Sequence, residues 1–128
     1  TTDASQFRHA AKWFTREGVA MTRVKSGVFV SAALRYANTV LIDCVLARRG
    51  DADAGAIFVH IDALDGRHKL LARSLNFDSE YEWNIITSTE WVDAEAASTR
   101  LAAEIKMDQD AFIIAVCDAE ARNPFDAL

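Results

Sequence analysis

Proline, glycine and cysteine are scarce in this sequence, whose 128 residues include one proline, five glycines and two cysteines. So few chain-breaking residues exclude a long disordered linker. The two cysteines, Cys44 and Cys117, lie within apolar runs, and we interpret them as buried thiols of a reducing compartment. A single disulfide between two strands is the alternative. We therefore expect a cytoplasmic protein.

The sequence also lacks a long uninterrupted apolar segment. Its most apolar region, residues 27–47, is broken by Arg35, Asn38 and Asp43, whereas a membrane span needs about 18 clean apolar residues. Residues 1–14 lack the apolar core of a secretory signal. An excess of basic residues is missing too, because the net charge is −5. This balance disfavours nucleic acids and anionic membranes as partners.

Hydrophobic residues are abundant, at 51% of the chain, which is enough for a core without a metal or disulfide. The length is close to the commonest size of a single domain. Residues 3–17 predict an amphipathic helix, because apolar side chains recur there at helical spacing. Its stripe consists of Phe7, Ala10, Ala11 and Phe14, with Trp13 on the flank. We expect residues 1–20 to form an N-terminal extension and residues 21–128 to form one α+β domain.

Hydrophobic periodicity predicts the other elements. Apolar or alternating runs predict strands over residues 21–30, 39–47, 56–62, 67–74, 81–87 and 111–117. Helical spacing predicts helices over residues 31–38 and 87–106, the second capped by Thr87 or Thr89. This order predicts an α+β fold with a mixed, mostly antiparallel sheet of about five to six strands and two or three helices.

Three details of this fold follow from local patterns. The nearly continuous apolar run 39–47 is typical of a central strand. Asp65-Gly66 signals a tight hairpin between the two strands that flank it. If strands 81–87 and 111–117 are parallel neighbours, the crossover between them should be right-handed. The end of the chain is predicted to be a polar tail.

The stretch RRGDADAG, residues 48–55, concentrates charge between two apolar runs. A calcium loop is excluded, because Gly55 and Ala56 stand where that loop needs an oxygen donor and a glycine. The simplest interpretation is a hairpin turn in which aspartates accept backbone N–H bonds while Gly50 and Gly55 adopt positive φ. The alternative is a site for an anionic or metal-bound ligand, formed by Arg48, Arg49, Asp51 and Asp53.

No pattern typical of an active site is present. The chain lacks a Gly-x-Ser-x-Gly elbow, a phosphate loop and a dinucleotide fingerprint. His9, His60 and His68 lie on separate elements without zinc-ligand spacing. We therefore predict no catalytic residue, no metal and no cofactor. His60 and His68 could still face each other across the hairpin through cross-strand pairing.

Charged residues raise two more questions. Asp43 lies within an apolar run, so it should either form an ion pair with an arginine or lie on an exposed strand face. The candidate partners are Arg35, Arg48 and Arg49.

A nucleic-acid surface would need a basic cluster and stacking aromatics, for which the candidates are Arg48, Arg49, Arg67, Lys69, Arg73, Tyr81 and Trp83. The acidic balance makes this the weakest hypothesis.

Three segments of the chain resemble a family of small bacterial proteins, catalogued as domain of unknown function 1491. They are RVKSGVFVSAALR, VLARRGDADAGAIFVHIDALDG and MDQDAFIIAVCD. The resemblance covers about residues 22–120, with Met107 and Gln109 where the family has phenylalanine and proline, and residues 1–20 precede the family's usual start. No activity is implied by this resemblance.

Our first functional hypothesis is a non-enzymatic interaction or accessory protein. Phe7, Trp13 and Phe14 are its candidates for docking on a protein partner, a second copy of the chain, or the chain's own sheet. The second hypothesis is a ligand-binding domain or enzyme that uses the RRGDADAG turn, and the third is nucleic-acid binding.

Overall fold

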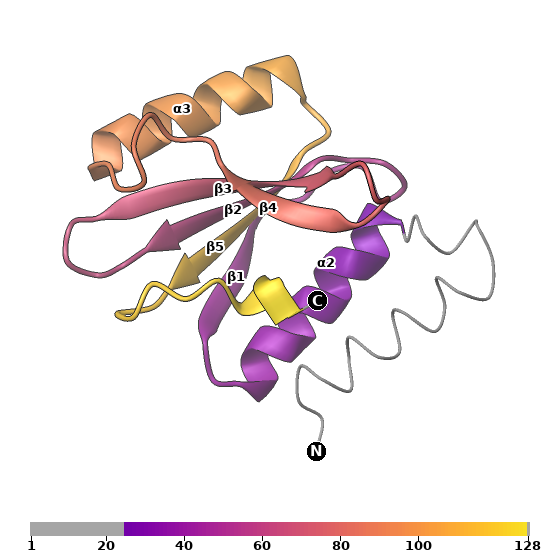
Figure 1. Cartoon of the computed structure of the whole chain (residues 1–128), viewed down its shortest axis with the longest axis horizontal. Helices are drawn as coiled ribbons and strands as arrows, with labels where there is room; N and C mark the ends of the chain where they lie inside the picture. Colours follow the sequence, from indigo (N-terminus) through magenta and orange to yellow (C-terminus); the bar gives the residue numbers. More distant parts are fainter. Residues whose placement is uncertain (1–24, 128) are drawn as a thin grey trace.

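Five strands form one sheet in the computed structural model, which describes residues 25–127 (Figure 1). The strands are β1 (Asp43–Arg48), β2 (Ile57–Asp62), β3 (His68–Leu75), β4 (Tyr81–Ile85) and β5 (Phe112–Cys117). Their order is β1-β5-β2-β3-β4, with β2 and β5 parallel and the other neighbouring pairs antiparallel. The predicted α+β class with a mixed, mostly antiparallel sheet is therefore confirmed.

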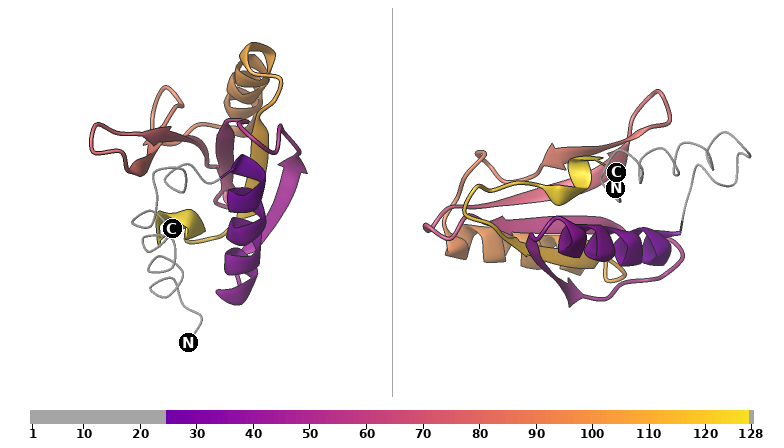
Figure 2. Two further views of the ribbon diagram at one scale, coloured as in Figure 1. Left: turned by 90° about the vertical axis from the view of Figure 1, so that its right-hand side faces the viewer. Right: turned by 90° about the horizontal axis from the view of Figure 1, so that it is seen from below.

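Two α-helices and a short 3-10 helix cover the sheet. They are α2 (Ser26–Thr39), α3 (Ala94–Met107) and η2 (Pro124–Ala127). The helix α2 and the turn η2 lie on one face, and α3 lies on the other (Figures 1 and 2). None of these helices is long and apolar enough to cross a membrane.

Strand alternation divides the core between the two faces. Ile57, Val59 and Ile61 of β2 belong to the larger core beneath α2 and η2. Phe58 points the other way, into a smaller cluster that includes Leu101 of α3. Successive side chains of a strand point to opposite faces, so the pattern of β2 correctly predicts which residues enter which layer.

The predicted strand over residues 21–30 is wrong from Ser26 onward, because α2 begins there; residues 21–24 lie outside the described part. Phe29 and Val30 favour strands locally. In the fold they belong to a longer buried stripe at helical spacing. The stripe consists of Phe29, Val30, Ala33, Tyr36 and Ala37. Burial of this stripe against the sheet outweighs the local strand preference.

The predicted central strand over residues 39–47 is an edge strand instead. Thr39 ends α2, Leu41 adopts a positive φ of 61°, and β1 starts at Asp43. Side chains along β1 alternate between exposed and half-buried, because only one face of this strand packs against the larger core, through Cys44 and Leu46. The apolar run therefore reflects a helix end, a turn and a half-buried strand in succession.

The central position belongs to β5, which lies between β1 and β2. Strands 81–87 and 111–117 are therefore not neighbours, contrary to the condition set for a crossover between them. The helix α3 also starts later than predicted, with Asp93 as its cap, whose carboxylate accepts a hydrogen bond from the N–H of Ala96 at 2.8 Å. Val92, directly before this cap, does not join the helix, because its backbone pairs with that of His68 through two hydrogen bonds of 2.8 and 2.9 Å.

Two connections differ from their predictions in detail. The β2–β3 hairpin is confirmed, but its loop spans residues 63–67 rather than a two-residue turn, with Gly66 at a φ of 93°. The end of the chain is not simply a polar tail, because Phe125 of η2 is fully buried in the larger core. Its position at the end of the chain gives no periodicity from which burial could be predicted.

Candidate functional site

The RRGDADAG loop connects β1 to β2 and rests on the start of α2. The backbone N–H of Gly27 donates to the carbonyl of Ala52 at 2.8 Å. The Ser26 hydroxyl donates to the carbonyl of Gly55 at 2.6 Å. These bonds fasten the first turn of α2 to a loop almost thirty positions further along the chain.

The same loop packs against the segment before β5. The N–H of Asp51 donates to the carbonyl of Asp110 at 2.8 Å. A Cβ atom on Gly50 or Gly55 would lie 2.1 or 2.2 Å from that carbonyl oxygen, so neither position has room for a side chain. The predicted positive φ of these two glycines is wrong, since Gly66 is the one described glycine with positive φ. Close backbone approach explains them instead.

The charges of the loop are used without any pairing between its own arginines and aspartates. Arg48 donates through Nη1 to the carbonyl of Ala111 at 2.7 Å. Asp51 accepts from the N–H of Asp53 at 3.1 Å, which confirms the aspartate-stabilised turn. The carboxylate of Asp53 lies 3.4 Å from the ammonium of Lys25, with both side chains exposed.

Arg49 is the one motif arginine that remains exposed, and within residues 25–127 it has no ion pair or hydrogen bond. The structure thus brings together all three segments that carry the family resemblance, at the start of α2, the RRGDADAG loop and Asp110. We name this arrangement the signature cluster. A ligand role for Arg48, Arg49, Asp51 and Asp53 stays a prediction, and three of these residues already have structural partners.

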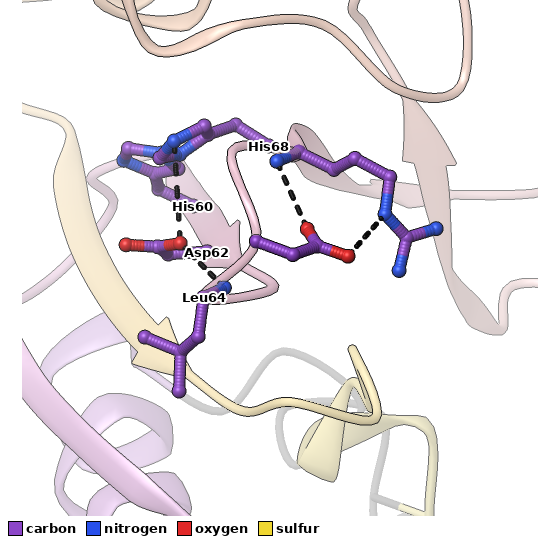
Figure 3. A network of polar contacts seen from close by, with 6 residues as sticks. His60, Asp62, Leu64 and His68 are labelled. Atoms are coloured by element: carbon purple, nitrogen blue, oxygen red, sulfur yellow. Dashed lines mark hydrogen bonds and ion pairs between the residues drawn. The ribbon is translucent and has the colours of Figure 1, made fainter.

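A second polar cluster lies where β2 and β3 meet their connecting loop (Figure 3). His60 Nε2 lies 3.0 Å from His68 Nδ1, which confirms that the two imidazoles face each other. His68 Nε2 is 4.0 Å from a carboxylate oxygen of Asp62, and that oxygen accepts the N–H of Leu64 at 2.8 Å. No three histidine, cysteine or acidic side chains in the described part are arranged to hold a metal.

The pKa of His60 is lowered from its usual 6.5, first by burial and second by the neighbouring His68, while Asp62 acts in the opposite direction. An unfolded chain therefore binds a proton at this residue at higher pH than the folded chain does. The free energy of unfolding should then decrease as pH falls through about 6.5. We expect the His60 imidazole to titrate below 6.5 by NMR, and a midpoint at or above 6.5 would contradict this.

The two cysteines are half-buried and unbridged, rather than fully buried as predicted. Burial is the main factor that raises the pKa of Cys44, to about 11, followed by the charges of Asp43 and Cys117. Burial also raises the pKa of Cys117. Both thiols are therefore protonated near neutral pH, which makes them poor nucleophiles. Asp43 is exposed at the start of β1 and has no ion pair within residues 25–127.

The proposed basic cluster for nucleic acid is divided between opposite ends of the sheet. Arg67, which directly precedes β3, and Lys69 near its start each lie 4.6 Å from the ring centre of Trp91. Arg73 lies further along the same strand, between the rings of Phe29 and Tyr81 at 3.7 and 3.6 Å. These three cations stack on the protein's own aromatic rings.

An apolar surface that we did not predict lies on the β3–β4 hairpin. Leu75 and Tyr81 are paired across the two strands and are 42% and 40% exposed, and Phe77 at the tip is fully exposed. We name these three residues the hairpin patch. The same hairpin carries three exposed acidic residues, Asp78, Glu80 and Glu82, which have no ion pair in the described part of the chain.

The tip that carries Phe77 is ordered by hydrogen bonds. The side-chain oxygen of Asn76 accepts the N–H groups of Asp78 and Glu80 at 2.9 and 3.0 Å. The backbone of Asn76 adds two more bonds, from its N–H to Glu80 and to its carbonyl from Ser79, at 2.8 and 3.1 Å. The signal in the sequence was a single phenylalanine inside the loop SLNFDSE, with no periodicity to reveal its exposure.

The third candidate set, Phe7, Trp13 and Phe14, lies outside the described residues. Among the described residues, the hairpin patch contains the exposed large aromatic side chains, Phe77 and Tyr81. Exposed aromatic side chains on an ordered support are typical anchors of protein interfaces.

Comparisons with known proteins agree with this fold. A family model described as "Protein of unknown function (DUF1491)" matches residues 24–126. The fold is similar to a DUF1491 family protein from Caulobacter crescentus CB15 solved by NMR, with 22% identity over 80% of this chain and 92% of that one and a TM-score of 0.68. A crystal structure of a DUF1491 protein from the same organism gives 20% identity over 83% and 93% of the two chains, and a TM-score of 0.65.

A third solved structure, a solution structure of a protein from A. tumefaciens, is 24% identical over 83% of this chain and 92% of that one, with a TM-score of 0.66. No curated protein matches the chain. At these identities the structures show a shared fold.

Proposed function

The chain belongs to the DUF1491 family, and from that premise we propose that it is a non-enzymatic protein-binding domain that contacts its partner through the hairpin patch. The observation that carries this proposal is Phe77, a large apolar side chain held fully in solvent by a hydrogen-bonded tip. Burying such a side chain is worth about 1.5–3 kcal/mol. An ordered tip also reduces the entropy lost on binding.

The surroundings of the patch define the chemistry of the partner. Asp78, Glu80 and Glu82 give the hairpin that carries Phe77 three exposed carboxylates, and none has a cationic partner in residues 25–127. A complementary surface would therefore offer an apolar pocket bordered by lysine or arginine. Complementary charges of this kind accelerate association and make it sensitive to salt.

The cellular location of the protein and the role of residues 1–20 are also part of this proposal. We propose a cytoplasmic location, because the chain has only two cysteines, whereas small secreted domains are usually rich in disulfides. We also propose that residues 1–20 act as an extension of the domain, since the family match begins only at residue 24.

Replacing Phe77 by serine should remove the partner without unfolding the protein. Truncating a central aromatic anchor typically costs about 2 kcal/mol or more of binding energy, which is more than tenfold in affinity. We would capture partners from the native cell with tagged full-length protein and quantify them by mass spectrometry. The matched control is Met107→Ser, which removes another large apolar side chain, 85% exposed, at the end of α3.

The expected result is a defined set of proteins held by the wild type and by Met107→Ser, depleted at least tenfold with Phe77→Ser. Elution of this set by added salt would agree with the acidic border. An identical set on all three proteins would overturn the proposal.

A further inference from the structure

A groove of about 740 Å³ lies on the face of the sheet that carries α2 and η2. Its apolar lining comes from the end of α2, from β3 and β4, and from η2. The main apolar lining residues are Val40, Ile42, Leu71, Trp83, Ile85 and Pro124. Ile85 is 45% exposed there, so part of this apolar surface faces solvent. The volume is in the range of natural binding pockets.

We propose that this groove is the docking site of the chain's own N-terminal segment, with Phe7 of the predicted helix 3–17 as the inserted side chain. The segment has the surface that the groove requires, because its apolar stripe runs along one side. The stripe comprises Phe7, Ala10, Ala11 and Phe14. Such a stripe is buried against an apolar surface when a helix docks.

The length of the segment matches the position of the groove. The helix α2 has 14 residues, which is about 21 Å at 1.5 Å per residue, and a helix over residues 3–17 would be about as long. Residues 18–24 provide a connection of ordinary length between two antiparallel helices. A helix that returns beside α2 would bring Phe14 level with the first turns of α2. Phe7 would then lie near the end of α2, where Val40 and Ile42 line the groove.

Charge favours the same placement. Residues 1–24 carry four basic and two acidic side chains, so their net charge is +2. The whole chain carries −5, which leaves −7 on the rest. The groove itself is lined by two acidic and two basic side chains, Glu120, Asp126, Lys69 and Arg122, and Glu120 lies 3.6 Å from Arg122, so the attraction comes from the domain as a whole. The polar side of the predicted helix carries Arg8, His9, Lys12 and Arg16. Attraction between the segment and the domain is therefore expected.

Of the docking surfaces considered from the sequence for Phe7 and Phe14, this placement selects the chain's own sheet. It is independent of the hairpin patch, whose three residues do not line the groove. A partner helix or a second copy would need to displace the segment before binding there. The proposal is therefore tested on the full chain alone.

The first measurement is an NMR search for nuclear Overhauser contacts between the Phe7 ring and the methyl groups of Ile42 and Ile85 in full-length protein. The second compares amide spectra of Phe7→Ser with Arg8→Ser, a neighbouring substitution on the polar side. We expect the contacts to be present, and Phe7→Ser to shift the resonances of Ile42, Trp83 and Ile85 while Arg8→Ser leaves them in place.

Absence of the contacts in the wild type, or shifts confined to residues 1–24 in Phe7→Ser, would overturn the proposal. A sample mixed from two differently labelled copies identifies the source of the contacts. Contacts between copies would mean that the segment is exchanged with a second chain, which would also overturn docking within one chain. The wild-type contacts are read without any substitution, so the result does not depend on the stability of a variant.

Discussion

Alanine in place of Gly50 is expected to destabilise the domain by about 3 kcal/mol, at the upper end of the cost of overpacking. The added Cβ would lie 2.1 Å from the carbonyl oxygen of Asp110 and within 2.8 Å of the backbone of Ala111 and Phe112. Backbone atoms cannot rotate away as a flexible side chain can. The loop must therefore separate from the segment before β5, which breaks the bond from Asp51 to Asp110 and disturbs the start of a central strand.

Urea unfolding of Gly50→Ala, followed by tryptophan fluorescence, would measure this effect. The matched control is Ala54→Ser, an exposed position in the same loop, where a change within about 0.5 kcal/mol is expected. Equal stability of the two variants would show that the loop is not fastened to Asp110. The structural interpretation of the signature cluster would then be wrong.

Alanine in place of Phe125 should cost about 3–5 kcal/mol, the usual range for a fully buried phenylalanine. Its ring is completely buried and lies 6.1 Å from the ring of Trp83, centre to centre. It belongs to the same core as α2 and β5, so its removal leaves a cavity between layers. Asp118 and Arg122 hold the approach to η2, with hydrogen bonds of 2.8 and 2.9 Å between their side chains.

Phe77→Ala is the control for this second prediction, because the same residue type is removed from a fully exposed position. We expect its free energy of unfolding to stay within about 0.5 kcal/mol of the wild type. The difference between the two phenylalanines is measurable by the same urea titration. A Phe125→Ala variant as stable as Phe77→Ala would mean that η2 does not close the core.

The sequence predicts the faces of individual strands better than the order of the strands in the sheet. The alternation of Ile57, Phe58 and Val59 correctly assigns side chains to the two faces, because strand geometry is local. The run from Thr39 to Ala47 was misassigned as a central strand. Strand order depends on contacts between distant segments, and such contacts leave no periodic signal in one stretch of sequence.

The candidate sites show the same division. The aspartate turn of RRGDADAG was predictable, since Asp51 accepts an N–H from a residue two positions later. Its attachment to Ser26 and Asp110 was not, because those residues are far away along the chain. A long and specific motif can thus serve to hold together three segments that are distant in the sequence. The exposure of Phe77 was equally hidden, because it depends on what the rest of the fold leaves uncovered.

In our proposal, the RRGDADAG motif supports the fold and the hairpin patch contacts the partner. The most direct test compares Arg49→Ala with Phe77→Ser in the quantitative capture of partners from the native cell. Arg49 is the exposed arginine of the motif and has no ion pair or hydrogen bond in the described part, so its removal leaves the signature cluster intact. We expect Arg49→Ala to retain the wild-type set and Phe77→Ser to lose it. Loss of the set with Arg49→Ala, and its retention with Phe77→Ser, would contradict both assignments.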